Sequence, residues 1–514
     1  MGKVNLDALI PREDFEVDEN QIPGKKKETI SIEDIKSDSF FFINVRKPDF
    51  QRETNEWDDK KITQFIKSFI EGDLIPAIIL WRSSGGYLFV IDGSHRLSSL
   101  SAWVNDDYGD GNISKMFYDG VIPDEQIEIA NKTRKHINLT IGTYKDFKLA
   151  LTHADKVKPE IVLKAKNLGA LAIQLQWVEG NARKAENSFF KINQQAAPID
   201  KTELKLLKTR RYPNSIAARA IIRSGKGHKY WSKFSNTIQI EIQKLAGNIN
   251  EALFNPKLNT PVKTLDIPIG GKLYAASTLP LILDFVNISN NIDNKTKLED
   301  DSTGDETINK LKRTLKVAQL INSNHPSSLG LHPVIYFYSK DGRHKTALFY
   351  SIIKFAIELK NKNKLNDFIR ARKGVENIIW NYDYLIQQIN RRYRSSLKSY
   401  PYVADFLLKS VEKLNQGFSE IETINNLIQE HFKYLTLEKQ EFEETTSKIF
   451  NTNRKSAVYI KDAIESAPKC NICRGLIHKN SISIDHKDRK EDGGLGTVLN
   501  GQLTHPYCNT GYKN

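Results

Sequence analysis

The chain has 514 residues and a formal net charge of +14, from 76 Lys and Arg residues against 62 Asp and Glu residues. This length is more than one hydrophobic core usually serves and predicts two or three domains, and a hydrophobic content of 39% suits globular ones. No apolar run approaches the ~18 residues of a transmembrane helix, so we expect no membrane partner. The positive charge favours a polyanionic partner such as nucleic acid.

The first 30 residues are polar and charged, with no apolar secretory leader after Met1. We therefore predict a polar tail at residues 1–30. The chain has only three cysteines, an odd number that argues against a set of structural disulfides. Together these features predict a protein of the reducing cytoplasm.

A strand-to-helix turn is predicted near residue 92. The apolar run Tyr87–Ile91 has the character of a strand, and helical spacing of apolar residues follows from Leu97, which places Asp92-Gly93 at the turn. The first turn of such a helix offers free N–H groups to an anion, and Arg96 could clamp phosphate oxygens. For an isolated Asp-Gly turn, a helix cap and a surface cation are the simpler interpretation.

The surrounding pattern favours the anion site. Phe50-Gln51-Arg52 and Trp57 precede an apolar helical stretch at 62–70, and Asp92-Gly93-x-x-Arg96 follows. This pattern, with the segment FFKINQQAAPIDKTEL that begins at Phe189, resembles GmrSD-type restriction proteins over roughly residues 31–231. Their amino-terminal domain has a ParB/sulfiredoxin-like fold and a D-G-Q-Q-R motif linked to nucleotide binding and hydrolysis.

The resemblance implies a nucleotide-binding sensor domain at residues 31–235. In this sequence Ser94 and His95 stand where the motif has two glutamines, which leaves open which nucleoside triphosphate binds and whether it is hydrolysed. The residues that the resemblance assigns to the nucleotide pocket are Asp92, Gly93, His95, Arg96, Gln51, Arg52 and Asn193.

The middle of the chain, residues 236–445, is predicted to be mostly helical, with a polar loop at 287–309. Two basic stretches, 201–229 and 370–398, are candidates for contacts with nucleic acid, although solvated helix faces explain them equally well. The second stretch contains Arg372, Lys373, Arg391, Arg392 and Arg394, interleaved with Trp380, Tyr382, Tyr384 and Tyr393.

The three cysteines lie close to the carboxyl terminus. Cys470-x-x-Cys473 and His505-x-x-Cys508 supply two pairs of soft ligands, the pattern of a structural zinc site. A segment of ~45 residues buries too little apolar surface to fold alone, so a metal would hold it together. The alternative is a group of reactive or buried cysteines with no metal.

Between the two ligand pairs we predict a β-hairpin. Ile482 and Ile484 alternate with serines in a short strand that ends at Asp485 and His486. Gly493-Gly494 allows a tight turn, and a second extended piece at 498–503 includes Asn500. A short helix would then begin at Cys508-Asn509.

This order of residues resembles the zinc-stapled HNH endonucleases, which carry a ββα-metal module, here residues 446–514, and end in a Cys-Asn pair followed by Lys513. The resemblance implies that His486 is the general base and that Asp485 and Asn509 hold one catalytic Mg²⁺ or similar divalent cation. Asn500 would orient the imidazole or help to position the metal.

We therefore expect an α+β multidomain protein with a ParB/sulfiredoxin-like amino-terminal domain, a helical middle and a carboxy-terminal ββα-metal HNH module with structural Zn²⁺. The expected function is cleavage of phage or foreign DNA, including modified DNA, gated by a nucleotide. Two alternatives stay open, namely a nucleotide-switched DNA-binding protein whose zinc module does not cut and an RNA nuclease. A homo-oligomer or a partner from a defence system is also open.

Overall fold

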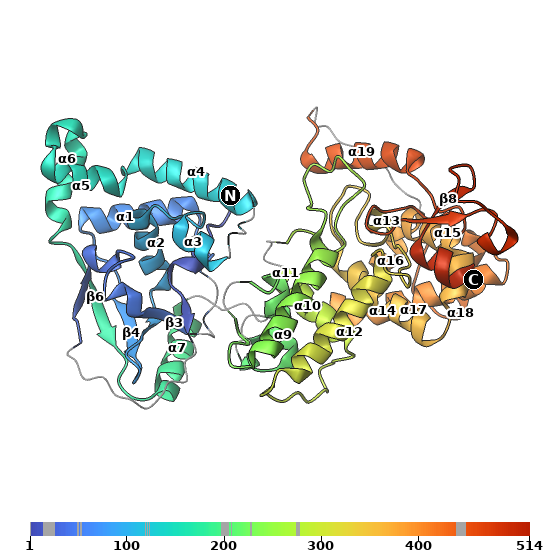
Figure 1. Cartoon of the computed structure of the whole chain (residues 1–514), viewed down its shortest axis with the longest axis horizontal. Coiled ribbons are helices and arrows are strands. Elements are labelled where there is room, and N and C mark those ends of the chain that lie inside the picture. Colours follow the sequence, from blue (N-terminus) through green and yellow to red (C-terminus); the bar gives the residue numbers. More distant parts are fainter. Residues whose placement is uncertain are drawn as a thin grey trace. The chain divides into compact units, whose positions relative to one another are not determined.

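The computed structural model forms an α+β chain (Figure 1). It describes residues 2–13, 26–48, 51, 54–118, 120, 122, 124–196, 205, 206, 208–226, 229–273, 278–437 and 449–513. The chain divides into two compact units. Unit 1 comprises Met1–Arg210 and Lys226–Tyr230, and unit 2 comprises Arg211–Gly225 and Trp231–Asn514.

Unit 1 contains a six-stranded sheet in the order β1-β3-β5-β4-β6-β2. β5 is parallel to β3 and antiparallel to β4, and β4 is parallel to β6. β5 is buried along nearly its whole length, as its continuous apolar run predicted. The strands are β1 (Arg12–Glu13), β2 (Thr29–Ser31), β3 (Val45–Pro48), β4 (Ile78–Arg82), β5 (Leu88–Asp92) and β6 (Ala172–Trp177).

Helices cover both faces of this sheet (Figure 1). α1 begins at Asp59 because the Asp58 side chain caps it, and it buries the stripe Ile62, Ile66 and Ile70. The other helices of unit 1 are α2 (Ser94–Asn105), α3 (Asn112–Phe117), α4 (Asp124–Thr140), α5 (Tyr144–Thr152), α6 (Pro159–Leu168) and α7 (Ala182–Ala196); α1 itself is Asp59–Glu71. Short 3₁₀ turns lie at η1 (Asp7–Leu9), η2 (Glu33–Ile35), η3 (Phe42–Asn44) and η4 (Ala154–Lys156).

Residues 2–13 are part of the fold, so the prediction of a polar tail is wrong for them. β1 pairs with β3, and Leu9 and Ile10 are buried in the core. The buried carboxylate of Asp7 binds the guanidinium of Arg12 and lies 2.7 Å from Nζ of Lys47. The charges that suggested a solvated tail are thus paired in the interior, where an unpaired charge would be costly.

Unit 2 is mostly helical, which confirms the prediction for the middle of the chain. The predicted loop at 287–309 is shorter, because α11 continues through Ser289 and α12 begins at Asp305. The helices are α9 (Pro213–Ile222), α10 (Asn236–Phe254), α11 (Thr278–Ser289), α12 (Asp305–Ile321), α13 (Pro333–Tyr336), α14 (Thr346–Asn361), α15 (Leu365–Asn381), α16 (Asp383–Tyr393), α17 (Ser396–Asn415), α18 (Glu420–Glu430) and α19 (Thr452–Ser466).

The carboxy-terminal segment contains two short antiparallel strands, β7 (Ser483–His486) and β8 (Gly501–Thr504), joined through a 3₁₀ turn η5 (Lys490–Asp492). A final helical turn, η6 (Cys508–Tyr512), packs against β7. The predicted order of strand, strand and helix is therefore present, while its assignment to the HNH fold stays a prediction.

This segment belongs to the same compact unit as the helices, so the predicted boundary between residues 445 and 446 does not separate two compact bodies. The reason is a set of contacts with the loop after α12. Ser328 accepts a backbone hydrogen bond from Tyr507 N at 3.0 Å, and its hydroxyl lies 3.0 Å from that of Ser481. The buried side chains of Asn322 and His478 also meet, at 3.1 Å.

Candidate functional site

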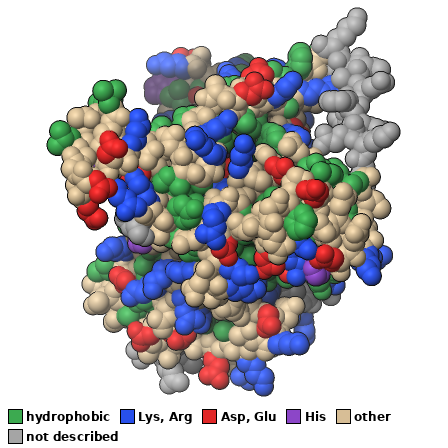
Figure 2. Space-filling model, turned by 90° about the vertical axis from the view of Figure 1, so that its right-hand side faces the viewer, with side chains coloured by type: hydrophobic (Ala, Val, Ile, Leu, Met, Phe, Trp, Pro, Cys, Tyr) green, Lys and Arg blue, Asp and Glu red, His purple; other side chains and the backbone are tan. Residues whose placement is uncertain are grey.

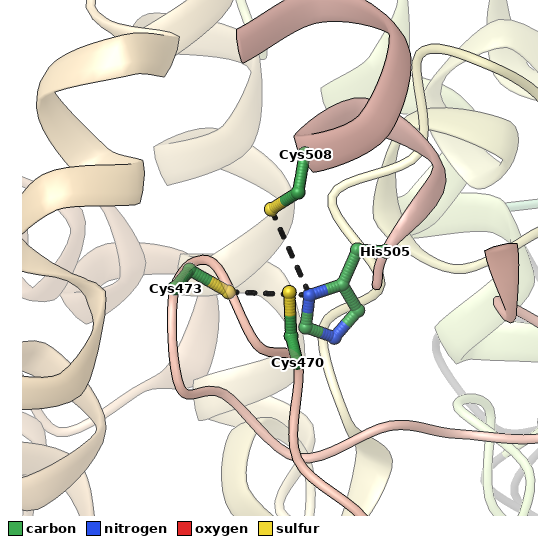
Figure 3. Close-up of side chains that lie close together, drawn as sticks. All are labelled: Cys470, Cys473, His505 and Cys508. Carbon is green, nitrogen blue, oxygen red and sulfur yellow. Dashed lines mark hydrogen bonds between the residues drawn. The ribbon is translucent and has the colours of Figure 1, made fainter. Parts of the chain in front are cut away.

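The four predicted zinc ligands come together in one buried cluster, Cys470, Cys473, His505 and Cys508 (Figure 3). Their sulfur and nitrogen atoms all lie within 4.8 Å of one another, and Nδ1 of His505 is 3.2 Å from Sγ of Cys473. Three thiols and one imidazole are the donors of a tetrahedral zinc site, so the cluster could bind zinc.

The state of His505 suits this cluster. Its Nε2 donates to the carbonyl of Leu476 at 3.0 Å, which leaves the lone pair of Nδ1 directed at the sulfurs. Hydrogen bonds from Cys473 and then Cys508 hold the pKa of Cys470 well below the usual thiol range, whereas hydrogen bonds with Cys470 and then Cys473 raise the pKa of Cys508. The thiols therefore interact closely, and metal binding would require them to lose their protons.

Arg372 of α15 lies against this cluster, which sequence reasoning missed. Its guanidinium is fully buried, with Nη1 at 3.1 Å from Nδ1 of His505, and it donates to the carbonyls of Leu329 and Gly330 and to Glu376. The suggestion that Arg372 contacts nucleic acid is therefore wrong. No local sequence pattern indicates this contact; in the structure, a Cβ at Gly475 would collide with Nε of Arg372.

Asp485, the predicted acidic residue of the nuclease site, is nearly buried at the end of β7. Its carboxylate accepts hydrogen bonds from Gln502 Nε2 and Lys513 Nζ, both at 2.8 Å. Lys513 also donates to the backbone carbonyl of His486. The ammonium group thus supplies positive charge to a carboxylate that has little water around it.

His486 and Asn509 lie on the two elements that flank Asp485. The imidazole of His486 is half-buried and faces the loop before β8, where a Cβ built on Gly496 would be 4.0 Å from its Nε2. Asn509, on η6, uses its Nδ2 to donate to Ser483 Oγ at 2.8 Å and to the carbonyl of Ile484 at 3.3 Å. Its Oδ1 is consequently the atom that could serve as a metal ligand.

Asn500 holds the loop between the strands rather than the imidazole. Its side chain accepts from Asp488 N at 2.8 Å and donates to the carbonyls of Asp488 and Leu495 at 3.2 and 2.8 Å. The predicted tight turn is present, with Gly493 left-handed at φ 86° and Gly494 pressed against the backbone of Asp488. Asn500 thus binds the loop that contains Gly496, which lies near the imidazole of His486.

In unit 1, five of the predicted nucleotide residues gather around the start of α2. Gly93 adopts φ 100° at the junction of β5 and α2, and no side chain caps the helix. Arg96 donates to Asp92 at 2.8 Å and to the carbonyl of Ala77 at 3.1 Å. Gln51 Nε2 donates to the hydroxyl of Ser94 at 3.2 Å.

The same site contains an unsatisfied acceptor. Among the residues that the structure describes, Oε1 of Gln51 has no hydrogen-bond partner although the side chain is nearly buried. Such a group is uncommon without a ligand or water to satisfy it. His95, in contrast, packs on Trp57 with ring centroids 5.5 Å apart and accepts from Glu56 N, which favours a structural role.

Two predicted pocket residues are not located. Arg52 lies outside the described residues, and so does the side chain of Asn193, whose backbone belongs to α7. In the described parts of both units, no helix is long and apolar enough to span a membrane.

Comparison with known proteins bears on unit 1. No curated protein and no solved structure matches the chain. A family model does match, and it covers about a third of the chain, including all of β3, β5 and α2. Residues 31–210 match the model of the GmrSD restriction endonuclease, N-terminal domain, which confirms the predicted resemblance for this part of the chain.

Proposed function

We propose that this protein is a metal-dependent DNA endonuclease that restricts foreign DNA, including modified DNA, with an HNH-type site formed by β7, β8 and η6. The observation that carries the proposal is the position of Asp485, His486 and Asn509 beside a buried cluster of three cysteines and one histidine. The match of residues 31–210 to a restriction-endonuclease domain supports the same class of activity.

The residues fit the chemistry of phosphodiester hydrolysis. The imidazole of His486 is half-buried and can accept a proton from an attacking water. Asp485 and Asn509 offer the hard oxygen ligands that a Mg²⁺ ion prefers. Such an ion would neutralise charge that develops on the phosphate oxygens.

Zinc would have a separate, positioning role. Cys508, one of its four ligands, directly precedes Asn509 on η6, while His505 follows β8. Closing the cluster therefore fixes η6 against β7 and sets the orientation of Asn509 next to Ser483. The ion holds the site together and takes no part in the reaction.

The start of α2 would bind the phosphates of a nucleoside triphosphate. Uncapped N–H groups at the helix start attract an anion, and the guanidinium of Arg96 can contribute two parallel hydrogen bonds. Gly93 has φ 100°, a conformation that favours glycine, and a Cβ there would meet Ile78 and Arg96. A nuclease that cuts its host without restraint would be lethal, so a nucleotide-dependent gate gives this domain a purpose.

The non-cutting alternative has one observation in its favour. Asp485 is already neutralised by Lys513, so the site as it stands can be stable without a divalent cation. A module in that state could hold the phosphate backbone without hydrolysing it. The RNA alternative rests on the same residues, because metal and histidine would serve either phosphodiester.

The test is Mg²⁺-dependent cleavage of unmodified plasmid, modified phage DNA and RNA by the wild-type protein and by His486→Ala, each with and without each nucleoside triphosphate. We expect cleavage of DNA by the wild type alone. A protein that binds DNA but never cuts it would support the non-cutting alternative. Preferred cleavage of RNA would support the alternative of an RNA nuclease. Equal cleavage with and without nucleotides would remove the proposed gate.

A further inference from the structure

A pocket of about 430 Å³ lies at the carboxyl end of α16, and none of its lining residues belongs to the metal or nucleotide sites described above. We call it the arginine pocket, and its lining residues are Gln388, Arg391, Arg392, Arg394, Tyr434 and Thr436.

Three guanidinium groups of this pocket have no carboxylate partner among the described residues. Of the carboxylates that the structure describes, none lies within 4.0 Å of Arg391, Arg392 or Arg394. Some cations elsewhere in unit 2 are paired; Lys413, for example, lies 2.9 Å from Glu430. Unpaired arginines at such density repel one another, so their grouping favours an anionic ligand.

The wall opposite the arginines is fixed. The side-chain amide of Gln388 accepts from Thr436 N at 2.9 Å and donates to the carbonyl of Thr436 at 3.0 Å. Phe432 and Leu435 are buried and anchor the same segment. The pocket is therefore formed before any ligand arrives, which lowers the entropic cost of binding.

Two of the arginines are also held in position. The guanidinium carbon of Arg392 lies 4.6 Å from the ring centroid of Tyr434, which orients the group while its N–H donors remain at the edge. Arg394 follows the last turn of α16 with φ 57°, an uncommon conformation for a residue other than glycine. This backbone turn brings a third guanidinium to the same pocket.

The helix itself does not account for this arrangement. A helix carboxyl end favours nearby cations, which explains Arg391 and Arg392 in the last turn of α16. It does not explain Arg394, which lies beyond that turn. It also does not explain the wall around Thr436, which completes a concave site.

The chemistry of the lining selects phosphate oxygens. Guanidinium groups donate and never accept hydrogen bonds, and the one aromatic ring in the pocket already lies under Arg392, so it is not free to stack on a base. α15 packs against α16 on one side and against η6 on the other, which places the pocket and the candidate nuclease site in one compact unit.

We propose that the arginine pocket binds backbone phosphates of DNA next to the segment that is cut. The contact is independent of sequence and adds affinity without base recognition. This inference rests on the proposed function in one respect only, namely that DNA is the polyanion.

The test compares two triple variants of the full-length protein. The first replaces Arg391, Arg392 and Arg394 by Gln. The matched control replaces Lys364, Arg370 and Lys413 by Gln, which removes the same charge from cations that are already paired with carboxylates. Binding of a fluorescent duplex of about 30 base pairs is measured by anisotropy in EDTA over a range of salt concentrations.

We expect the pocket variant to lose roughly 10- to 100-fold in affinity at moderate salt, and its plot of log K against log salt to be shallower by about 2 to 3, since each phosphate contact contributes about 0.9. The control should change little. Equal losses in both variants, or no loss in the pocket variant, would overturn the proposal. Circular dichroism of both variants verifies that they are folded.

A second ligand is tested in the same way. If the pocket variant keeps its affinity for DNA but loses binding of ATP, measured by calorimetry, the pocket is a nucleotide site and the proposal fails. Because binding is measured in EDTA, the result is independent of whether the protein cuts DNA. Failure of the pocket and failure of the nuclease proposal are therefore distinguishable.

Discussion

The two candidate sites differ in what holds them. Asp92 and Arg96 lie where a buried strand meets a helix, and the core around them extends over the sheet and the helices of unit 1. Asp485 and His486 end a four-residue strand whose outward side chain, Ile484, is 61% exposed. The first site rests on the large core of unit 1, whereas the second lies in a region with few buried apolar residues of its own, namely Leu476, Ile477 and the three cysteines.

In the carboxy-terminal region around Asp485 and His486, specific polar contacts take the place of a large core. Asp485 on β7 and Ser481, two residues before this strand, are buried polar residues, and the apolar side chains of Val498 and Leu499 are almost fully exposed. Figure 2 shows hydrophobic side chains at the surface, among Lys and Arg side chains, on the face of the molecule that it draws. A region built in this way depends on single contacts, so removing one contact should have a large effect.

The largest expected effect is at the metal cluster. His505→Gln should abolish stoichiometric zinc and remove a binding free energy on the order of 10 kcal/mol from the folded state of the carboxy-terminal region. A chelator should produce the same change in the wild type. Elemental analysis and hydrogen exchange of residues 468–513 provide the measurements.

The matched control for this variant is His478→Gln, which changes another buried histidine of the same region that is not a predicted ligand. It should retain zinc. Chelation should leave the amides of unit 1 protected from exchange. If they lost protection together with those of the carboxy-terminal region, the metal would not stabilise that region alone.

The next largest effect is expected at Arg372. Arg372→Met leaves Glu376 and the cysteine cluster without their buried cation, which should lower the free energy of unfolding of unit 2 by about 3–5 kcal/mol. Zinc affinity should fall as well, because the guanidinium offsets the charge of the thiolates.

Arg370→Met on the same helix removes only an exposed ion pair with Asp367, and a change of about 0.5 kcal/mol is expected. Denaturant unfolding and a competitive zinc chelator measure both quantities. Equal effects of the two variants would show that Arg372 contributes only as a surface charge does.

The free energy of unfolding of unit 2 should depend on pH in the acid range. Burial lowers the pKa of His344 and of His478 to about 4, below the ordinary value near 6.5. Between these values the unfolded chain binds protons that the folded chain does not. The free energy of unfolding of unit 2 should therefore fall by about 1.4 kcal/mol per pH unit for each histidine as the pH drops from 6.5 to 4.

Above pH 6.5 these two histidines should make no difference to stability. His344→Gln should make the acid dependence of unfolding less steep, while replacement of the exposed His325 should leave it unchanged. An identical slope in wild type and His344→Gln would contradict the assignment of a neutral, buried imidazole.

The smallest effect is expected at the amino-terminal site. Arg96→Gln should weaken binding of a nucleoside triphosphate by about 1.5–3 kcal/mol, the range for a hydrogen bond to a charged group, and leave the melting temperature of unit 1 nearly unchanged. Calorimetric titration with each nucleotide measures the first quantity. Unfolding of unit 1 in this variant would show that the ion pair with Asp92 is needed for the fold.

Much of both sites could be predicted from local patterns. Continuous apolar residues indicated β5 and helical spacing indicated α1, because both depend on neighbouring residues in the chain. Each pair of soft ligands is also a local pattern, and the two pairs together indicated the metal cluster. Alternation at Ile482 and Ile484 correctly predicted a strand. It did not reveal that the isoleucines face outward, since period two is the same for either face.

The sequence by itself determined the elements and the residue types at each site. These are a strand-to-helix turn at Asp92-Gly93, and a hairpin whose first strand ends in Asp485 and His486, between two pairs of soft ligands. Only the tertiary structure decided the long-range partners, which include Asp7 with Lys47, Arg372 with His505 and Asp485 with Lys513. The physical reason is that a buried charge must find an opposite charge or a hydrogen bond, and any surface brought near by folding can supply it.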